Sequence, residues 1–439
     1  MRCSIKNGTR ESNGTICQEH PLEVISIVII RWSVFALTAC ALLLVRASQV
    51  LGADFSIHPS LAISEEYTDN VFDSNLNIRS DYITRAQPGL TLKYNAPFWD
   101  WDLSYAYDYR YYARGSRKND TTHNINGRGL IKIVDEVLFL EVSDVYTRVS
   151  LDVTRDTTGE SLYLNQTDQN VGTVSPYLVL HPTARLTLRT GYRYINTWYK
   201  EAQAVSKQDH LGIMNSSYEL SSKFFLTGDY TFTREIPVNS NSFYRHEAYL
   251  GPRYEYAQNS FIYAKGGFIS TDYDNGINLL YPSWNAGITH TLDTLTANIT
   301  TGTTYADDPL GASTLETFYR ASLTKTLQRG SLTLQGSYTK FSDAIADELR
   351  NKRYSGGFIG TFEIMQGFGG TLGLTYENYH DLLLNGTTDR YFVDCGLNYS
   401  FGKELTAGFS YKYIDYSSAV IAADNRQVNR VSLEVRKVF

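Results

Sequence analysis

Charged side chains recur at even spacing in several segments of this 439-residue sequence. Arg185, Arg189 and Arg193 follow one another at intervals of four residues, so an extended strand carries all three on one side. The intervening residues are largely apolar, and each arginine at lipid depth would cost about 2–4 kcal/mol near the bilayer midplane. Guanidinium rows of this kind either hydrate the wall of a pore or select anionic or sugar solutes. The candidate lumen-lining residues are Arg185, Arg189, Arg193, Arg245, Glu247, Arg253, Glu255, Arg128, Lys132, Arg430, Glu434 and Arg436.

Patterns that carry catalysis or hold a metal are missing from the sequence. It contains no Gly-x-Ser-x-Gly, Walker loop, His-Glu-x-x-His or Rossmann fingerprint in a usable context. Most of its eight histidines are isolated, and the acidic pairs at 65–66 and 307–308 are typical of solvated positions. A membrane hydrolase would instead need clustered Ser, His and Asp or paired carboxylates. We therefore predict no enzyme, no cofactor and no metal site.

The composition excludes several classes of protein. The 40 Lys and Arg are outnumbered by 46 Asp and Glu, which is unlike a nucleic-acid binder, and 42% hydrophobic residues exclude a disordered chain. Only one segment has the apolar length to cross a bilayer as a helix, so a helical transporter is excluded too. The 34 Tyr and 32 Gly against 3 Met are typical of strands and their turns. The mature chain is therefore expected to be all-β.

Residues 1–53 are interpreted as an N-terminal leader and signal peptide. An uncharged apolar run of h-region length precedes a few small residues, and polar sequence begins at Asp54. Cleavage is expected after Ala53 or one residue earlier. A permanent transmembrane anchor and lipidation at Cys40 are the alternatives, although the apolar run continues past that cysteine. Only Cys395 remains in the predicted mature chain, so no intramolecular disulfide is expected.

One unit repeats along the chain from residue 55 onward. Segments of about 10–14 residues alternate apolar and polar side chains, and they are joined in turn by short links and by long polar loops. Even-numbered strands with loops sorted by length are typical of a bacterial outer-membrane barrel. We predict a single transmembrane antiparallel β-barrel over 54–439, of about 20 strands (range 16–22), with short periplasmic turns and long extracellular loops. Short links are expected near 95–99, 134–136, 181–184, 221–224, 257–260, 292–295, 327–331, 365–369 and 401–404.

The two faces of the predicted strands indicate where the protein resides. About eight strands already give a barrel filled by side chains, so a much larger barrel cannot hide its apolar face inside. The apolar face must therefore look outward into lipid, and closure is required because lipid offers no partner for a free strand edge. Tyrosines at segment ends, such as Tyr94, Tyr192 and Tyr254, fit aromatic belts at the headgroup level. These features predict the outer membrane of a Gram-negative bacterium.

The last predicted strand, residues 430–439, closes on a phenylalanine. Val431, Leu433 and Val435 share one face with Phe439. This ending resembles the C-terminal signal by which outer-membrane barrels are recognised by their insertion machinery. Phe439 is therefore predicted to be an assembly signal.

Three short motifs carry a resemblance to a known family. They are residues 63–72, which read ISEEYTDNVF, then Pro88-Gly89-Leu90, and Ser175-Pro176-Tyr177 with the strand after it. Together they resemble the beta-barrel porin type 2 family, whose members include outer-membrane barrels associated with exopolysaccharide and PEP-CTERM gene clusters. The resemblance implies a passive or secretory outer-membrane pore, linked in some members to polysaccharide export, and it implies no catalytic residues.

Two functions fit the predicted barrel. The first is a porin-like channel that passes saccharide or exopolysaccharide across the outer membrane. The second is a structural or surface interaction barrel, plugged by its own loops or filled by a partner such as a multihaem cytochrome. The expected partners are outer-membrane lipid, the barrel insertion machinery and periplasmic polysaccharide-export components, and no nucleic acid is expected.

Overall fold

The computed structural model describes residues 53–151, 166–306, 309–311, 314–419 and 425–439. The chain divides into two units, Met1–Ala53 and Asp54–Phe439, and every strand belongs to the second. The predicted leader lies outside the described residues except for Ala53, so it stays a prediction. The strands are β1 (Asp54–Thr68), β2 (Asp81–Ala96), β3 (Trp99–Tyr112), β4 (Asp120–Val134), β5 (Leu138–Ser150), β6 (Gln166–Thr183), β7 (Leu186–Tyr199), β8 (Lys207–Ser221), β9 (Phe224–Pro237), β10 (Phe243–Ala257), β11 (Ser260–Tyr273), β12 (Asn278–Leu292), β13 (Leu295–Tyr305), β14 (Thr314–Leu327), β15 (Gly330–Asp343), β16 (Glu348–Met365), β17 (Phe368–Asp381), β18 (Gly386–Ser400), β19 (Leu405–Ser418) and β20 (Arg426–Val438).

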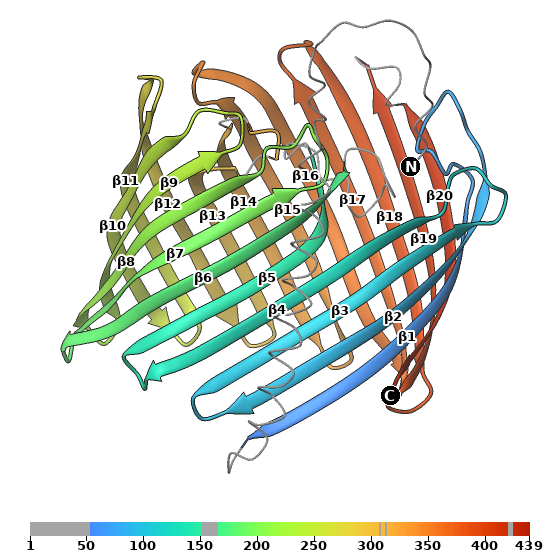
Figure 1. Ribbon diagram of the computed structural model, residues 1–439, viewed down its shortest axis with the longest axis horizontal. Helices are drawn as coiled ribbons and strands as arrows, with labels where there is room; N and C mark the ends of the chain where they lie inside the picture. Colours follow the sequence, from blue (N-terminus) through green and yellow to red (C-terminus); the bar gives the residue numbers. More distant parts are fainter. Residues whose placement is uncertain (1–52, 152–165, 307–308, 312–313, 420–424) are drawn as a thin grey trace, which may run out of the picture. The chain divides into compact units, whose positions relative to one another are not determined.

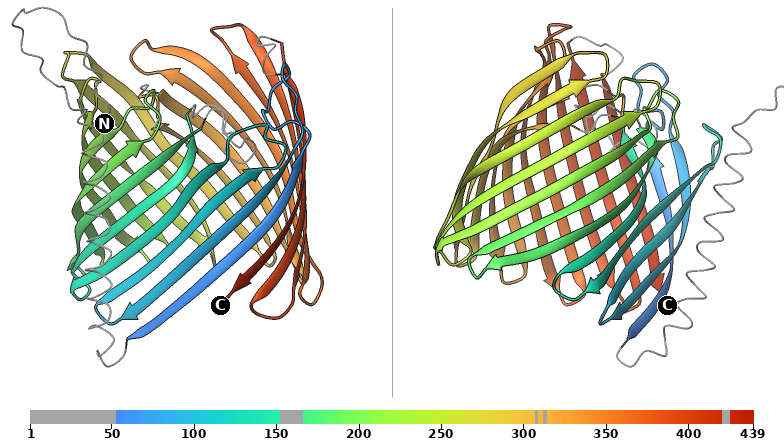
Figure 2. Two further views of the ribbon diagram at one scale, coloured as in Figure 1. Left: turned by 45° about the vertical axis from the view of Figure 1, so that its right-hand side comes forward. Right: turned by 60° about the vertical axis from the view of Figure 1, so that its left-hand side comes forward.

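These strands form one closed antiparallel sheet. Each strand pairs with its neighbours along the chain, and β1 also pairs with β20, from Ser60 opposite Val438 to Thr68 opposite Arg430. Figures 1 and 2 show the strands running obliquely around the wall. Because β1 and β20 pair with each other, neither is a free edge. The backbone N–H and C=O groups of a free edge would have no hydrogen-bond partners in lipid. The predicted barrel is confirmed, and its strand number is twenty.

The connections sort to opposite ends of the barrel. Nine short turns, from 97–98 after β2 to 401–404 after β18, lie at one end, which we call the turn rim. The other ten connections, among them 69–80 after β1, lie at the opposite end, the loop rim. In the turn after β10, Asn259 has a φ of 55° and the ladder shifts register between Glu255 and Ala257, as in hairpin loops that end on a left-handed residue with a bulge. The structure places a connection at or next to each of the nine predicted short links.

Large apolar side chains lie on the outside of the wall. Leu250, Leu334 and Leu433 expose 60%, 59% and 61% of their surface, and the buried apolar residues described form only two small clusters. In water each such side chain would forgo the stabilisation of burial, about 1.5–3 kcal/mol, whereas hydrocarbon covers it. The chain is therefore built for lipid around it, in the outer membrane of a Gram-negative cell.

Within the described residues, no helix is long and apolar enough to cross a membrane.

The ladder between β12 and β13 is incomplete at the loop rim. It runs from Leu292 opposite Leu295 only as far as Asn285 opposite Gly302. The first half of β12 is therefore an edge on that side, and Pro282 lies in it, a residue that sheets confine to such positions. The break separates the end of β13 from β12.

Candidate functional site

Ion pairs that skip a strand identify the concave face of the wall. Lys265 on β11 reaches Asp229 on β9 at 2.5 Å, across β10. Arg189 on β7 likewise reaches Glu141 on β5 at 3.9 Å, across β6. Side chains two strands apart lie closer together on the inside of a curved sheet than on its outside, so ion pairs between them favour the inside. These residues therefore line the lumen, and the rest of that face follows at every second position.

Two of the three arginines in the predicted row face the lumen from a strand. Arg189 and Arg193 lie on the concave face of β7 and line one hollow, and Arg189 Cζ sits 4.0 Å from the centre of the Tyr177 ring. Arg185 instead lies in the exposed turn between β6 and β7. β7 begins at Leu186, because the first ladder hydrogen bond and not the spacing of the arginines sets where the strand starts.

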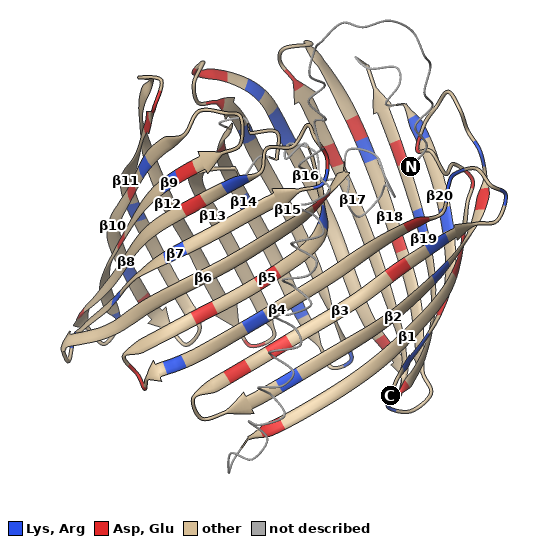
Figure 3. Ribbon diagram, viewed as in Figure 1, with Lys and Arg blue, Asp and Glu red and all other residues tan. Residues whose placement is uncertain are grey.

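Most of the other predicted charges have a partner of opposite sign on the same face. Arg128 lies opposite Asp102 on β3, and Glu247 follows Arg245 on the lumenal face of β10, toward the loop rim. Figure 3 shows positive and negative bands interspersed over the strands. Exposed pairs of this kind contribute about 0–1 kcal/mol each, so they hydrate the wall more than they hold it together. The pairs are Lys132–Asp100 at 3.3 Å, Arg253–Glu255 at 2.9 Å and Arg436–Glu434 at 3.1 Å.

Arg430 is more deeply buried than the other predicted lumenal residues. It is buried, and its guanidinium lies 2.7 Å from Asp73 and 4.0 Å from Glu66. Asp73 belongs to the connection after β1, and Asn70 of the same connection donates its side-chain amide to the carbonyl of Gln427 at 3.4 Å. Arg430 thus ties this loop to the inside of β20.

The end of β13 packs against the inside of β10. The Tyr249 hydroxyl donates to the carbonyl of Thr303 at 3.4 Å, and Arg245 Cζ lies 3.7 Å from the centre of the Tyr305 ring. β10 and β13 are separated in the wall by β11 and β12. Contact between them therefore requires the end of β13 to reach into the lumen.

The chain continues across the lumen after β13. The amide of Val205, in the connection after β7, donates to the carbonyl of Pro309 at 2.7 Å. Gly311 has a φ of 71°, and a Cβ there would lie 2.9 Å from a methyl group of Val205, so glycine suits this approach. We call residues 303–306 and 309–311 the strap.

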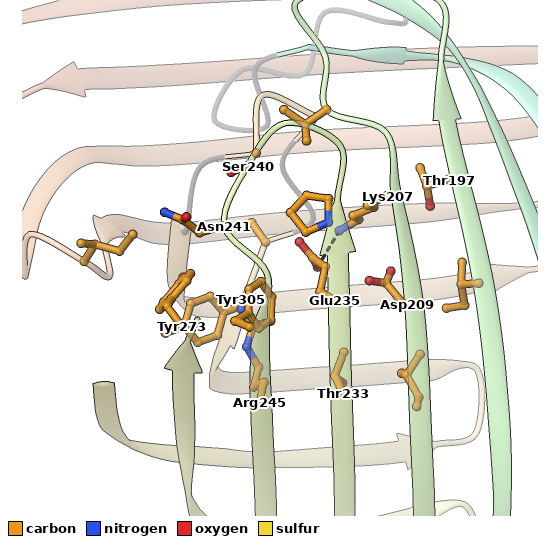
Figure 4. Close-up of a pocket in the computed structure, with 18 of the residues that line it drawn as sticks. Thr197, Lys207, Asp209, Thr233, Glu235, Ser240, Asn241, Arg245, Tyr273 and Tyr305 are labelled. Atoms are coloured by element: carbon orange, nitrogen blue, oxygen red, sulfur yellow. Dashed lines mark hydrogen bonds and ion pairs between the residues drawn. The ribbon is translucent and has the colours of Figure 1, made fainter. Parts of the chain in front are cut away.

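A cavity of about 340 Å³ lies between the strap and the wall from β6 to β11, and we call it the strap cavity. Figure 4 shows Lys207 and Glu235 facing each other in it, joined by an ion pair of 3.0 Å, with Asp209 on the neighbouring strand. Its side chains can donate and accept hydrogen bonds and also offer ring faces, which suits a polyhydroxylated solute. The other labelled lining residues are Thr197, Thr233, Ser240, Asn241, Arg245, Tyr273 and Tyr305.

Sequence analysis does not single out the strap cavity. Of the predicted lumenal residues only Arg245 lines it. Lys207, Asp209 and Glu235 each look like an ordinary charge near a strand end, because nothing local shows that they meet under a folded-in segment. The one available signal is that β13 is short and is followed by a polar stretch of turn residues from Ala306.

No group of three or more His, Cys, Asp or Glu side chains in the part of the chain that the structure describes is placed to hold a metal ion. The one cysteine in that part, Cys395, is a free thiol.

Comparisons with known proteins bear on the fold. No protein-family model matches the sequence, and no curated protein matches it. The FrpB iron transporter from Neisseria meningitidis is similar in structure, with a TM-score of 0.51 and 8% identity over 87% of this chain and 81% of that one. The siderophore receptor PirA from Pseudomonas aeruginosa aligns with a TM-score of 0.49 and 10% identity, over 87% of this chain and 80% of that one.

OccK2 from Pseudomonas aeruginosa aligns over 88% of this chain and 98% of that one, with a TM-score of 0.45 and 10% identity. At such low identities the fold alone is shared. The fold of this chain is that of outer-membrane β-barrels, and its resemblance to the exopolysaccharide-associated family remains a prediction.

Proposed function

We propose that this barrel is an outer-membrane channel for polar solutes, with its long loops outside the cell and its short turns in the periplasm. The lumen is lined by paired charges, and water-lined walls of this kind pass polar solutes. The strap cavity carries the proposal, because it gathers hydrogen-bonding groups and aromatic rings at one rim. No catalytic step is part of the proposal.

The proposed solute class is saccharide. Sugar hydroxyl groups both donate and accept hydrogen bonds, which matches Lys207, Glu235 and Asn241, and sugar C–H faces pack on rings such as Tyr273. The resemblance to exopolysaccharide-associated barrels supports export of a polysaccharide, with periplasmic export components as partners. Phe439 is the proposed assembly signal for the insertion machinery.

Planar-bilayer recording of the purified chain tests the channel. We expect steady ion conductance, with transient block by a linear oligosaccharide added on the loop-rim side. The double variant Lys207→Met, Glu235→Met removes the polar pair without cutting side-chain length, so conductance should persist while block weakens. Conductance without any saccharide block in the unaltered protein would contradict the solute class.

Orientation has its own test. A tag inserted at Lys118, in the connection after β3, should bind antibody on intact cells, whereas a tag at Arg329, in the turn after β14, should bind only after permeabilisation. The reverse pattern would invert the proposed topology.

A plugged structural barrel is the second candidate. Two observations favour it, because the connection after β1 and the strap both fold inward at the loop rim. A closed barrel would show no conductance until one of these segments is displaced. Conductance of the unaltered chain would exclude this alternative.

A further inference from the structure

Three triads of tyrosine, a second aromatic ring and histidine repeat along the wall. In each, the histidine lies directly opposite the second ring, which is on the preceding strand. The tyrosine two residues before that ring contacts the histidine Nδ1 through its hydroxyl. The triads are Tyr105–Tyr107–His123, Tyr192–Tyr194–His210 and Tyr230–Phe232–His246.

The three triads share one geometry. In chain order, the hydroxyl oxygen and Nδ1 are 3.0, 2.6 and 2.9 Å apart, and the histidine and opposite ring centres are 5.3, 5.2 and 5.1 Å apart. His123, His210 and His246 are each the fourth residue of a strand that begins at the loop rim, on β4, β8 and β10. Three hairpins thus place the same group at the same depth.

The triads lie on the outer face of the barrel. Arg128, Asp209 and Arg245 mark the lumenal face of β4, β8 and β10, and each triad histidine is an odd number of residues away. Side chains at odd spacing on a strand project to opposite faces. A position so close to the strand end lies at the level of lipid headgroups, where aromatic belts of barrels are found.

The hydrogen bond decides which imidazole nitrogen is left for a ligand. Each triad tyrosine hydroxyl lies within hydrogen-bond distance of Nδ1, and when the hydroxyl donates to that nitrogen the imidazole proton sits on Nε2. A doubly protonated imidazole also carries a proton on Nε2. In either state the outer face holds an N–H donor that needs an acceptor.

An arginine held in an ion pair lies next to two of the triads. Arg234 on β9 is directly opposite His210, on the same outer face. Its guanidinium lies 4.1 Å from the centre of the Tyr244 ring and is held by Asp274 at 2.7 Å. Asp274 accepts two of the five guanidinium N–H donors, so the others can join the two imidazole N–H groups in binding an oxygen-rich group at headgroup depth.

We propose that the triads bind phosphate groups of anionic lipids in the leaflet at the loop rim. The three Nε2–H groups donate to phosphate oxygens, and the second and third triads form the tightest site because Arg234 lies between them. The lipid is the occupant because these side chains face the membrane and not the lumen. The site is independent of the proposed channel, whose conductance it leaves unchanged.

Lipid retention measured by native mass spectrometry tests this proposal. The full chain is refolded in mixed micelles of phosphatidylcholine and phosphatidylglycerol, and the lipids that remain bound are counted. We expect the unaltered barrel to retain phosphatidylglycerol preferentially. The triple variant His123→Phe, His210→Phe, His246→Phe keeps the ring stacking and an apolar outer face, so it should fold, but it should retain phosphatidylglycerol about tenfold less per site lost.

Two matched variants make the result specific. His290→Phe removes an outer-face histidine that contacts Tyr256 at 3.1 Å near the turn rim, outside any triad, and should leave retention unchanged. The triple variant His123→Gln, His210→Gln, His246→Gln restores a side-chain N–H at each position and should recover part of the preference. Lipid A in place of phosphatidylglycerol should be retained through the same three histidines, since its phosphates offer the same oxygens.

Equal retention of phosphatidylglycerol by the unaltered chain and the triple phenylalanine variant would overturn the proposal. An equal loss in His290→Phe would overturn it as well, because the effect would then belong to outer-face histidines in general.

Discussion

Arg430 and Arg436 lie on the same lumenal face of one strand, β20, in opposite surroundings. The Arg430 side chain is 6% exposed and pairs with Asp73 at 2.7 Å, whereas the Arg436 side chain is 49% exposed and pairs with Glu434 at 3.1 Å. One position lies toward the loop rim, under an inward-folded connection, and the other toward the turn rim. The difference shows that an inward-folded connection covers lumenal side chains at one end of β20, whereas those at the other end face water.

The contrast holds on the far side of the barrel too. Lys207 and Glu235 are largely buried beside the strap, whereas Arg253 and Glu255 near the turn rim are well exposed. Buried pairs depend on excellent geometry because their desolvation is costly, and exposed pairs are screened by water. The proposed channel therefore predicts that folding stability and permeation are coupled at the loop rim.

The largest effect is expected at Arg430. Arg430→Met leaves the buried Asp73 without this partner, so unfolding free energy should fall by about 3–5 kcal/mol. Arg436→Met is the matched control on the same strand and should cost about 0–1 kcal/mol. Equilibrium unfolding in detergent measures both, and equal costs would show that the two ends do not differ as proposed.

The strap offers the next largest effect. Tyr305→Ala removes the ring under Arg245, a contact of about 2 kcal/mol where water is excluded, and should release the strap. Conductance in planar bilayers should rise together with the loss of stability. Tyr305→Phe keeps the ring and should behave like the unaltered chain, so a rise in that variant would point away from the ring contact.

Charge reversal on β7 should change selectivity more than stability. Arg189→Glu with Arg193→Glu replaces two lumenal cations by anions, and the reversal potential should shift toward cation preference, while folding changes by less than ~1 kcal/mol. Arg185→Glu, in the turn, should shift it less because that side chain is outside the strand. A failure of the double variant to insert would mean that these side chains face lipid.

The smallest effect is expected at the exposed Arg234–Asp274 pair of the loop rim. The hydrogen bond from Arg234 holds the pKa of Asp274 below its usual value. A carboxyl with a lowered folded-state pKa stabilises the fold above its unfolded pKa of about 3.9, and this contribution is lost as pH falls through the folded-state pKa. Asp274→Asn should therefore unfold slightly earlier than the unaltered chain at neutral pH, and their thermal midpoints should converge in acid.

The strand number and the lumenal faces follow from local pattern. Alternation with period two marks a strand and its two faces within each segment, and turn residues mark its ends, so twenty strands and nine short links can be read from the sequence. Arg189 and Arg253 face the lumen for this reason. Arg185 falls outside its strand because the last ladder hydrogen bond, and not the alternation, sets the boundary.

The histidine triads cannot be predicted from the alternation within single strands. His123, His210 and His246 look isolated in the chain, yet register with the preceding strand places each against a Tyr-x-Tyr or Tyr-x-Phe motif. Register depends on loop length and on the whole ladder, so the pairs become visible only in the folded sheet. A search for those motifs followed by a histidine early in the next strand would have found them.

The sequence by itself determined that this chain is a closed barrel with lipid outside and charge inside, because each segment carries its own alternation and twenty of them need closure. Only the tertiary structure decided that two segments fold inward at the loop rim. The contact of Val205 with Pro309 and that of Arg430 with Asp73 join residues far apart in the chain. They exist because closing the sheet makes β1 and β20 neighbours and brings the connections after β7 and β13 to the same rim, which no segment encodes alone.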